Sequence, residues 1–464
     1  MFNRSINEEC GVFGVYNCER ASELTYFGLQ SLQHRGQEGC GIVTADKVLH
    51  SHKGEGLVSK VFDRTNVAKL TGNHAIGHVR YSTTGESQLL NVQPFIFHSY
   101  NEDFGLCHNG NIVNADELRL ELEQKGTIFQ TTSDSEIIAH LLKRETGTFT
   151  ERLQKALPKL VGAFAFLFIF EDEMYAALDP NGLRPLSLAK LDDGYIVSSE
   201  TCGFTLVDAR FERDIMPGEI IKINKDGITS ATFGEKIQNK MCAMEYIYFS
   251  RPDSYLREES VYRVREQTGK YLAKQSDVQA DVVIGVPDSG LPAARGYAKE
   301  AGIIYEQGLL KNKYSGRTFI QPTNELRKLG IKLKLTVVEE LVRDKHVVVI
   351  DDSIVRGFTM QKIVDMLWQA GAKSVHVKIA SPAIVKPCFY GVDFSTEAEL
   401  ISNKMDCNQL AEFIHATSVD FLSVDNLQKA CNTDETKGLC LACFTGKYPT
   451  KLYKDTDSAN TVIK

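Results

Sequence analysis

Residues 346–359 read His-Val-Val-Val-Ile-Asp-Asp-Ser-Ile-Val-Arg-Gly-Phe-Thr, and this stretch decides the fold of the second half of the chain. Residues 347–350 are β-branched and apolar, which is typical of a strand buried in a parallel sheet. Asp351 and Asp352 follow the strand, and residues 360–369 have the pattern of a helix. Ligands of open α/β sheets bind outside the carboxyl ends of the strands. The sequence therefore predicts a binding site at this strand end.

The loop between the strand and the helix indicates what the site would bind. Backbone N–H groups that lead into a helix N-terminus bind anions. Two carboxylates beside them suit sugar hydroxyls or a hard cation. Together they predict a phosphorylated sugar, with phosphate in the loop and ribose on the acids. A strand and two acids alone leave open an Asp-Asp turn that caps an ordinary helix.

The full string is more specific, because it resembles the signature that binds phosphoribosylpyrophosphate (PRPP) in type I phosphoribosyltransferases. It is most similar to the version in the glutamine PRPP amidotransferase family. The resemblance implies an α/β domain with a parallel sheet over residues 240–464. The PRPP-binding residues that it implies are Asp351, Asp352, Ser353, Arg356, Gly357 and Thr359. Phe358 stands where the signature has a threonine, so one hydroxyl donor to the 5′-phosphate is missing.

The composition limits the class of protein. A chain of 464 residues predicts two or three domains, and 43% hydrophobic and 24% charged residues are typical of a soluble protein. The net charge of -7 argues against a nucleic-acid binder. The longest apolar run, residues 161–170, is half of the ~20 residues that a membrane span needs.

The cysteines indicate the compartment. The N-terminus lacks the apolar core of a signal peptide, and the eleven cysteines have irregular spacing. Without a secretion signal they predict cytoplasmic thiols, metal ligands or catalytic groups rather than a disulfide framework.

The first half opens with Cys10-Gly11 before an expected strand at residues 12–16. A cysteine at a strand end is usually structural when it stands alone. Here four motifs follow in order: a polar turn at residues 33–38, a strand end at 77–83, an expected turn at 108–111 and a helix start at 131–136.

This set resembles the glutaminase domain of class II, or N-terminal nucleophile, glutamine amidotransferases. The resemblance covers residues 10–235 and implies an α+β sandwich with αββα layers. In that family the cysteine is the first residue of the mature chain, and its α-amine is the general base. The interpretation therefore requires cleavage after Glu9, with residues 1–9 as a propeptide.

The resemblance also assigns roles. Cys10 would attack the side-chain amide of glutamine, and Asn109 with the N–H of Gly110 would stabilise the oxyanion. Arg80 would bind the α-carboxylate, because a planar guanidinium matches it, and Asp134 would bind the α-ammonium.

Arg35 would help to shape the same pocket. Each residue has a plainer interpretation when it is taken singly: a salt-bridged arginine, a helix-capping aspartate, or a hairpin turn at Asn-Gly.

Two further segments of the second half matter. Residues 282–286 predict a buried strand that ends in Pro287-Asp288-Ser289-Gly290, which by resemblance is the pyrophosphate loop. Ser289 would then lie with Asp351 and Asp352 around the Mg²⁺ of PRPP. Residues 308–336 are basic, and by resemblance they close over PRPP and seal a path for ammonia; a solvated charged face is the alternative.

Four cysteines match a metal pattern. Cys440 and Cys443 form a C-x-x-C, which alone indicates a redox, zinc or structural site. With Cys242 and Cys388 they resemble the ligands of the 4Fe–4S branch of the glutamine PRPP amidotransferases, which implies a structural cluster that fixes the tail. Tetrahedral zinc is the physical alternative.

The resemblance implies an enzyme that converts glutamine, PRPP and water into 5-phosphoribosylamine, glutamate and pyrophosphate, the first committed step of purine synthesis. It implies a homotetramer inhibited by purine nucleotides. Two alternatives are a related amidotransferase with another acceptor and a PRPP-sensing regulatory protein without turnover. The PRPP signature argues against the first, and the intact glutaminase set argues against the second.

Overall fold

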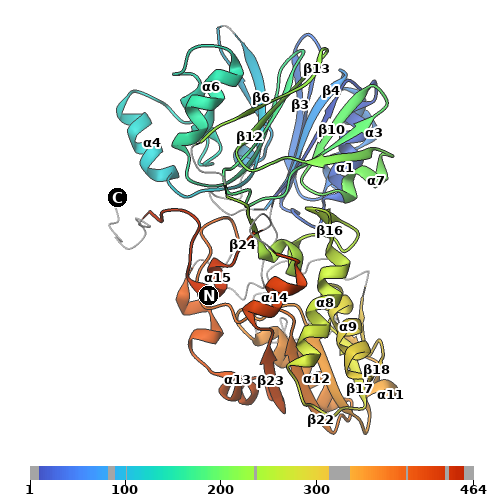
Figure 1. Cartoon of the computed structure of the whole chain (residues 1–464). Coiled ribbons are helices and arrows are strands. Elements are labelled where there is room, and N and C mark those ends of the chain that lie inside the picture. The colour runs from blue at the N-terminus through green and yellow to red at the C-terminus, as the bar shows by residue number, and fades with distance from the viewer. Residues whose placement is uncertain are drawn as a thin grey trace. The chain divides into compact units, whose positions relative to one another are not determined.

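The computed structural model describes residues 10–81, 89–100, 102–234, 238–312, 335–392, 396–433 and 438–453. The chain forms two compact units (Figure 1). The N-terminal unit contains the described parts of Asn7–Met241, Cys388–Asp393 and Lys447–Lys464. The C-terminal unit contains the described parts of Cys242–Pro387 and Phe394–Gly446. Two short pieces from late in the sequence thus pack with the N-terminal unit.

The N-terminal unit has two antiparallel sheets. The order of the first is β11-β9-β10-β1-β4-β2-β3, and that of the second is β13-β12-β8-β7-β6-β5. The strands of the first are β1 (Gly11–Tyr16), β2 (Gly39–Ala45), β3 (Leu49–Glu55), β4 (His74–Arg80), β9 (Ser187–Leu191), β10 (Gly194–Ser198) and β11 (Arg210–Asp214). The strands of the second are β5 (Phe95–His98), β6 (Asp103–Ile112), β7 (Gly162–Ile169), β8 (Met174–Leu178), β12 (Glu219–Asn224) and β13 (Gly227–Thr232).

The sheets face each other across one core and are covered by helices outside. Val12 and Ile76 of the first sheet pack with Leu167 and Ile221 of the second. The described helices are α1 (Ala21–Ser31), α2 (Val58–Val61), α3 (Arg64–Ala68), α4 (Ala115–Gln124), α5 (Glu136–Leu142), α6 (Phe149–Ala156) and α7 (Cys202–Leu206). One core cluster joins α1 and α7 to the first sheet, and another joins α5 and α6 to the second. These layers confirm the predicted αββα sandwich.

The C-terminal unit is built on a five-stranded parallel sheet with the order β18-β17-β21-β22-β23. Its strands are β17 (Val282–Gly285), β18 (Ile304–Tyr305), β21 (His346–Asp351), β22 (Ser374–Ile379) and β23 (Ser418–Phe421). The helices described with it are α8 (Val261–Lys274), α9 (Leu291–Ala301), α11 (Glu339–Val342), α12 (Phe358–Gln369), α13 (Cys407–Phe413), α14 (Val424–Ala430) and α15 (Ala442–Thr445). The predicted parallel α/β fold is confirmed.

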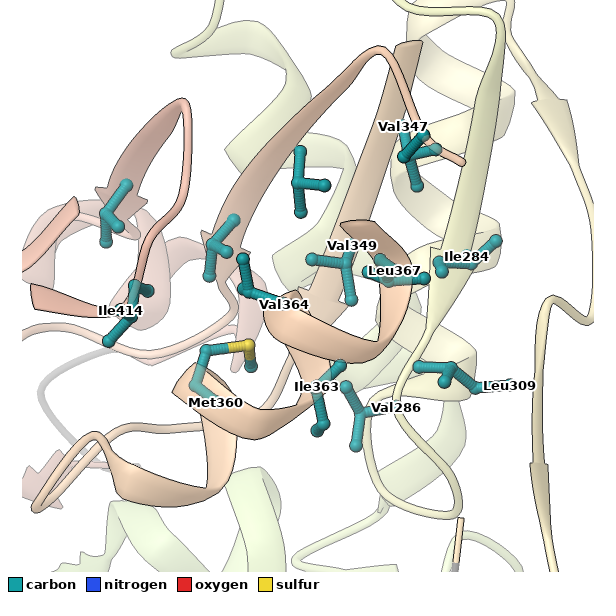
Figure 2. Packing of buried hydrophobic residues seen from close by; sticks show 14 of the residues in the cluster. Ile284, Val286, Leu309, Val347, Val349, Met360, Ile363, Val364, Leu367 and Ile414 are labelled. Atoms are coloured by element: carbon teal, nitrogen blue, oxygen red, sulfur yellow. The ribbon is translucent and has the colours of Figure 1, made fainter. Parts of the chain in front are cut away.

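The central strand and the following helix explain this sheet's core. The apolar residues of α12 recur at helical spacing and face the sheet, as Figure 2 shows for Met360, Ile363, Val364 and Leu367. They pack on Val347 and its neighbours in β21, which are wholly buried. The strand and helix predicted from residues 346–369 are both confirmed.

Short elements complete the described chain. Two-stranded sheets pair β14 (Lys240–Cys242) with β24 (Gly438–Cys440), β15 (Tyr255–Leu256) with β16 (Glu259–Ser260), and β19 (Leu309–Lys311) with β20 (Leu335–Val337). Single turns of 3₁₀ helix lie at Leu89–Asn91, Leu157–Lys159, Glu397–Glu399 and Ile401–Asn403, and a π-helical turn lies at Glu245–Phe249. Among the described residues, every helix is too short or too polar to span a bilayer.

One local prediction is wrong. Residues 108–111 were expected to form a turn, but they lie within β6 and pair with β7, with Asn109 opposite Ala165. Asn-Gly favours a hairpin only where no neighbouring strand takes its hydrogen bonds. Here Gly110 keeps a φ of +143° inside the strand, and a Cβ on it would collide with the carbonyl of Ala163. Glycine is therefore required at this position.

Candidate active sites

Cys10 lies buried at the start of β1, where it is held on two sides. Its Sγ donates to the carbonyl of Tyr81 at 3.4 Å, and its own carbonyl accepts from Nε of Arg35 at 3.0 Å. Nη1 of Arg35 bonds Oε1 of Glu200 at 2.7 Å, and both side chains are fully buried. Nε2 of His34 lies 2.7 Å from the same Glu200 oxygen. Arg35, predicted to shape the pocket, is here an anchor for the backbone of Cys10.

Asn109 and Gly110 approach this cysteine from the second sheet. The Asn109 amide donates to Oγ of Ser199 at 3.4 Å, and that hydroxyl also accepts the N–H of Val12 in β1 at 3.0 Å. Ser199 therefore joins the predicted oxyanion residue to the nucleophile's strand. The carbonyl oxygen of the Asn109 side chain is buried without a hydrogen-bond partner among the described residues.

The two predicted glutamine-binding residues lie in the same unit. Oδ2 of Asp134 accepts the N–H of Ile112 at 2.9 Å, which ties this carboxylate to the end of β6. Arg80 is the last residue of β4 and is buried. β1 and β4 are antiparallel, and Gly11 pairs with Val79. Continuing this register by one residue places Arg80 opposite Cys10, which directly precedes β1. Arg80 in β4 and Asn109 in β6 thus lie in the same unit as Cys10, and Asp134 is bonded to the end of β6.

The loop after β21 leads directly into the N-terminus of α12. Gly357 has a φ of +78° and begins α12, and a Cβ there would lie 2.9 Å from the side chain of Ile401. Arg356 pairs with Glu399 at 2.7 Å. The ring of Phe358 packs edge-on against Phe413, with centroids 5.8 Å apart. The loop is thus fixed to the segment around α13.

Of the two acids at the strand end, Asp351 is half-buried and Asp352 is buried. Burial, together with repulsion from Asp352, raises the pKa of Asp351 well above its ordinary value. Burial also raises the pKa of Asp352, although hydrogen bonds from Ser289 and Ser353 oppose the rise. Ser289 donates to Oδ2 of Asp352, and Ser353 donates to Oδ1 at 2.5 Å. A bound cation would favour the ionised forms of both acids and so oppose these rises.

Comparison with known proteins now identifies the family. Two family models match: a glutamine amidotransferase domain over residues 78–205 and a phosphoribosyl transferase domain over residues 254–385. The amidophosphoribosyltransferase of Bacillus subtilis strain 168 is 52% identical over 460 residues, or 98% of this chain and 96% of that protein. The Staphylococcus aureus strain Mu50 amidophosphoribosyltransferase is 49% identical over 461 residues, or 98% and 93%. The chain belongs to the amidophosphoribosyltransferase family.

Solved structures agree with this assignment. The B. subtilis glutamine PRPP amidotransferase complexed with ADP and GMP matches with a TM-score of 0.92 at 51% identity, over 96% of this chain and 98% of that chain. A structure described as the allosteric regulatory enzyme of purine biosynthesis matches with a TM-score of 0.92 at 52% identity, over 96% and 97%. The predicted family, fold class, enzyme class and purine-synthesis function are confirmed, and nothing found supports the non-catalytic sensor.

The cysteines predicted to bind a cluster are divided between the units. Cys242 and Cys440 end β14 and β24, and Cys443 lies in α15. The carbonyl of Cys443 accepts the N–H groups of Val385 and Lys386 at 2.9 and 3.0 Å. Cys388 accepts the N–H of Tyr390 on its sulfur at 3.3 Å. Within the described ranges, no three His, Cys, Asp or Glu side chains form a group that could hold a metal ion.

Some predictions fall outside the described residues. Residues 1–9, the predicted propeptide, are among these, as are residues 313–334, most of the basic stretch. At its described edge, Nζ of Lys311 pairs with Oδ2 of Asp288 at 2.5 Å.

Sequence reasoning missed two residues of the amidophosphoribosyltransferase site. Glu200 bonds Arg35, and Ser199 bridges β1 to Asn109. A buried glutamate does require a cationic partner. Nothing local in the sequence, however, points to an arginine 165 positions away.

Proposed function

We propose that this amidophosphoribosyltransferase releases ammonia from glutamine at Cys10 and transfers it to C1 of PRPP at the loop after β21. The products are 5-phosphoribosylamine, glutamate and pyrophosphate. The observation that carries the proposal is that one chain holds both constellations: an anchored cysteine whose strand is joined through Ser199 to Asn109, and paired acids before a loop that leads into α12. The domain bounds, 10–235 for the glutaminase and 240–464 for the phosphoribosyltransferase, belong to the same proposal.

In the glutaminase half, the thiolate of Cys10 attacks the side-chain carbonyl of glutamine. The Asn109 amide and the N–H of Gly110 stabilise the oxyanion, a kind of donor whose loss typically costs ~10²–10³ in rate. The tetrahedral intermediate collapses to a thioester and releases ammonia, and water then releases glutamate. Arg80 and Asp134 bind the two charged groups of the amino acid.

The proposal includes removal of residues 1–9. The α-amine of Cys10 is then free to take the thiol proton, as in other N-terminal nucleophiles. The hydrogen bond from Arg35 to the Cys10 carbonyl supports this, because it fixes the backbone of the new terminus.

In the phosphoribosyltransferase half, the 5′-phosphate lies on the loop of Ser353, Arg356, Gly357 and Thr359, where N–H groups lead into α12. The ribose hydroxyls bind Asp351 and Asp352. Asp351, Asp352 and Ser289 would hold the Mg²⁺ that accompanies PRPP, and the ion would supply positive charge to the pyrophosphate leaving group. Asp351, Asp352 and Ser289 fit such a hard ion because they offer only oxygen atoms, and a cation would offset the repulsion that raises the pKa of Asp351.

Cys242, Cys388, Cys440 and Cys443 are proposed to hold a 4Fe–4S cluster. Four thiolates suit iron–sulfur ligation, and the N–H of Tyr390 already donates to the sulfur of Cys388. When bound, the cluster would supply a structural tie rather than redox chemistry. The cysteines themselves fix the ends of β14 and β24 to the tail, and zinc is the alternative occupant.

We further propose a cytoplasmic homotetramer inhibited by purine nucleotides. Support comes from the B. subtilis relative, which was solved with ADP and GMP. Sedimentation would give the oligomeric state. Inhibition that falls as PRPP rises would indicate nucleotide sites that overlap the PRPP site.

The test of the main proposal is an anaerobic assay that follows glutamate and pyrophosphate together, with and without PRPP and Mg²⁺. We expect equal release of both products, dependent on PRPP. One outcome is that glutamine yields glutamate but no pyrophosphate, and that ammonia supplied in place of glutamine also yields no pyrophosphate. This outcome would show that the site at the Phe358 loop does not turn over PRPP. Amino-terminal sequencing checks the processing, since a mature chain that starts at Met1 would contradict it.

A further inference from the structure

A piece of the chain from the second half is built into the N-terminal unit beside the oxyanion residues. Residues 388–392 pack in this unit although they follow residue 387 of the other one. The side-chain amide of Asn111 donates to the carbonyl of Phe389 at 3.0 Å. The guanidinium of Arg184, which is 1% exposed, donates to the carbonyl of Tyr390. We call residues 388–392 the strap.

The strap lies against the Gly110–Asn111 peptide, which directly follows the N–H of Gly110. Gly391 has a φ of +112°, and a Cβ there would stand 2.9 Å from Nη2 of Arg184 and 3.7 Å from the carbonyl carbon of Gly110. On the other side of Gly110, a Cβ would collide with Ala163 of β7. The Gly110 backbone is therefore packed between β7 and the strap, with no space for adjustment.

The strap is itself fixed by neighbours in the same unit. The hydroxyl of Tyr390 lies 2.9 Å from Oγ1 of Thr450 and accepts the N–H of Thr450 at 3.2 Å. The rings of Phe389 and Tyr390 pack against Tyr448 at 5.4 and 6.3 Å. It is thus a defined element with its own contacts, able to support the strand end that it touches.

We propose that Asn111 and Arg184 are positioning residues for the oxyanion site, acting by holding the strap against Gly110. Neither residue touches the reacting atoms in this proposal. Their hydrogen bonds fix a wall behind the Gly110 peptide, so that its N–H and the adjacent Asn109 amide keep the direction that a developing oxyanion needs. The inference rests on the proposed glutaminase chemistry of Cys10 and assigns it two further residues.

The reason for expecting an effect on rate is the geometric demand of the reaction. An oxyanion donor acts only when it points at the oxygen in the transition state. A displacement of about 1 Å can cost on the order of 100-fold in rate. Binding of glutamine through Arg80 and Asp134 does not share this demand. The loss should therefore fall on kcat and leave KM nearly unchanged.

The test compares Asn111→Ala with the matched control Asn403→Ala. Asn403 makes the same kind of bond, from its amide to the carbonyl of Val385 at 2.9 Å, but in the C-terminal unit. We expect Asn111→Ala to lower kcat for glutamine hydrolysis by roughly 10- to 100-fold, with little change in KM. Asn403→Ala should retain the parent's kcat. Arg184→Lys, which keeps the charge but loses the planar fork, should act like Asn111→Ala.

Two further measurements separate positioning from unfolding. Alkylation of Cys10 by iodoacetamide, followed by mass spectrometry, needs a thiolate but no oxyanion donor, so it should proceed at the parent's rate. Ammonia-dependent pyrophosphate release should also be retained.

The proposal is overturned if Asn111→Ala leaves kcat unchanged, if Asn403→Ala lowers it equally, or if alkylation falls in parallel with kcat. If the unsubstituted chain does not turn over PRPP, that result contradicts the proposed transferase function. The role of Asn111 and Arg184 would still be tested by the rates of glutamine hydrolysis.

Discussion

Arg35 donates from Nε to the carbonyl oxygen of Cys10 at 3.0 Å, and its guanidinium is wholly buried. A cation in such a place requires a counter-charge, which Glu200 supplies at 2.7 Å. The buried ion pair of Arg35 and Glu200 thus also holds the backbone of Cys10, the proposed nucleophile, in place.

We predict that Arg35→Lys lowers kcat for glutamine hydrolysis by about 100-fold, because a lysine has a single charged head and cannot hold Cys10 and Glu200 together. This kcat is measured from the steady-state rate of glutamate release. The control is Arg213→Lys, since Arg213 makes a two-pronged pair with Glu219 at 2.9 and 2.8 Å in the same unit, away from Cys10. Equal losses in the two variants would mean that Arg35 only stabilises the fold.

Phe358 should weaken PRPP binding relative to a threonine at the same position. Phe358→Thr adds a hydroxyl that can donate to phosphate, and hydrogen bonds to charged groups are worth about 1.5–3 kcal/mol. We expect the KM for PRPP to fall roughly tenfold or more. Phe413→Leu removes the ring contact without adding a donor, so it should raise that KM. A higher KM in Phe358→Thr would show that the aromatic contact matters more than the hydroxyl.

Asp179 should make stability depend on pH. Burial raises the pKa of Asp179 from 3.8 to about 7, so the folded chain holds this proton more tightly than the unfolded chain does. Its contribution to the free energy of unfolding therefore falls as pH rises from about 4 to about 7, by at most ~1.4 kcal/mol per pH unit, and is constant above. Asp179→Asn should remove this slope in urea unfolding followed by circular dichroism.

The control for that slope is Asp46→Asn. Hydrogen bonds from the backbone of Val48 and the hydroxyl of Thr71 lower the pKa of Asp46 to about 2, so it is ionised in both states between pH 5 and 8. This variant should keep the parent's slope in that range. A slope that survives in Asp179→Asn would assign the effect to other groups.

The cluster proposal predicts a metal-dependent tail. Cys440→Ser should abolish iron binding and expose residues 438–453 to protease, because the thiolates fix that segment. Cys431→Ser is the matched control, a buried cysteine outside the proposed set. Iron and acid-labile sulfide in equal amounts are expected in the protein purified without oxygen. Zinc in their place would favour the tetrahedral alternative.

The sequence predicted best where the signal is local and periodic. The β-branched run of β21 and the apolar spacing of α12 are set by neighbouring residues, and both formed as expected. The acids and glycine of the following loop could be placed for the same reason. Residues 108–111 show the opposite case, because the turn chemistry of Asn-Gly was overridden by pairing along β7.

The sequence by itself determined the two fold classes, and it predicted the nucleophile and the anion loop, because motif spacing and hydrophobic period act over a few residues. Only the tertiary structure decided that Glu200 balances Arg35, that Ser199 joins Asn109 to β1, and that residues 388–392 pack behind Gly110. These are contacts between residues far apart in sequence. They follow from burial, since each buried charge or carbonyl must find a partner wherever the fold brings one within reach.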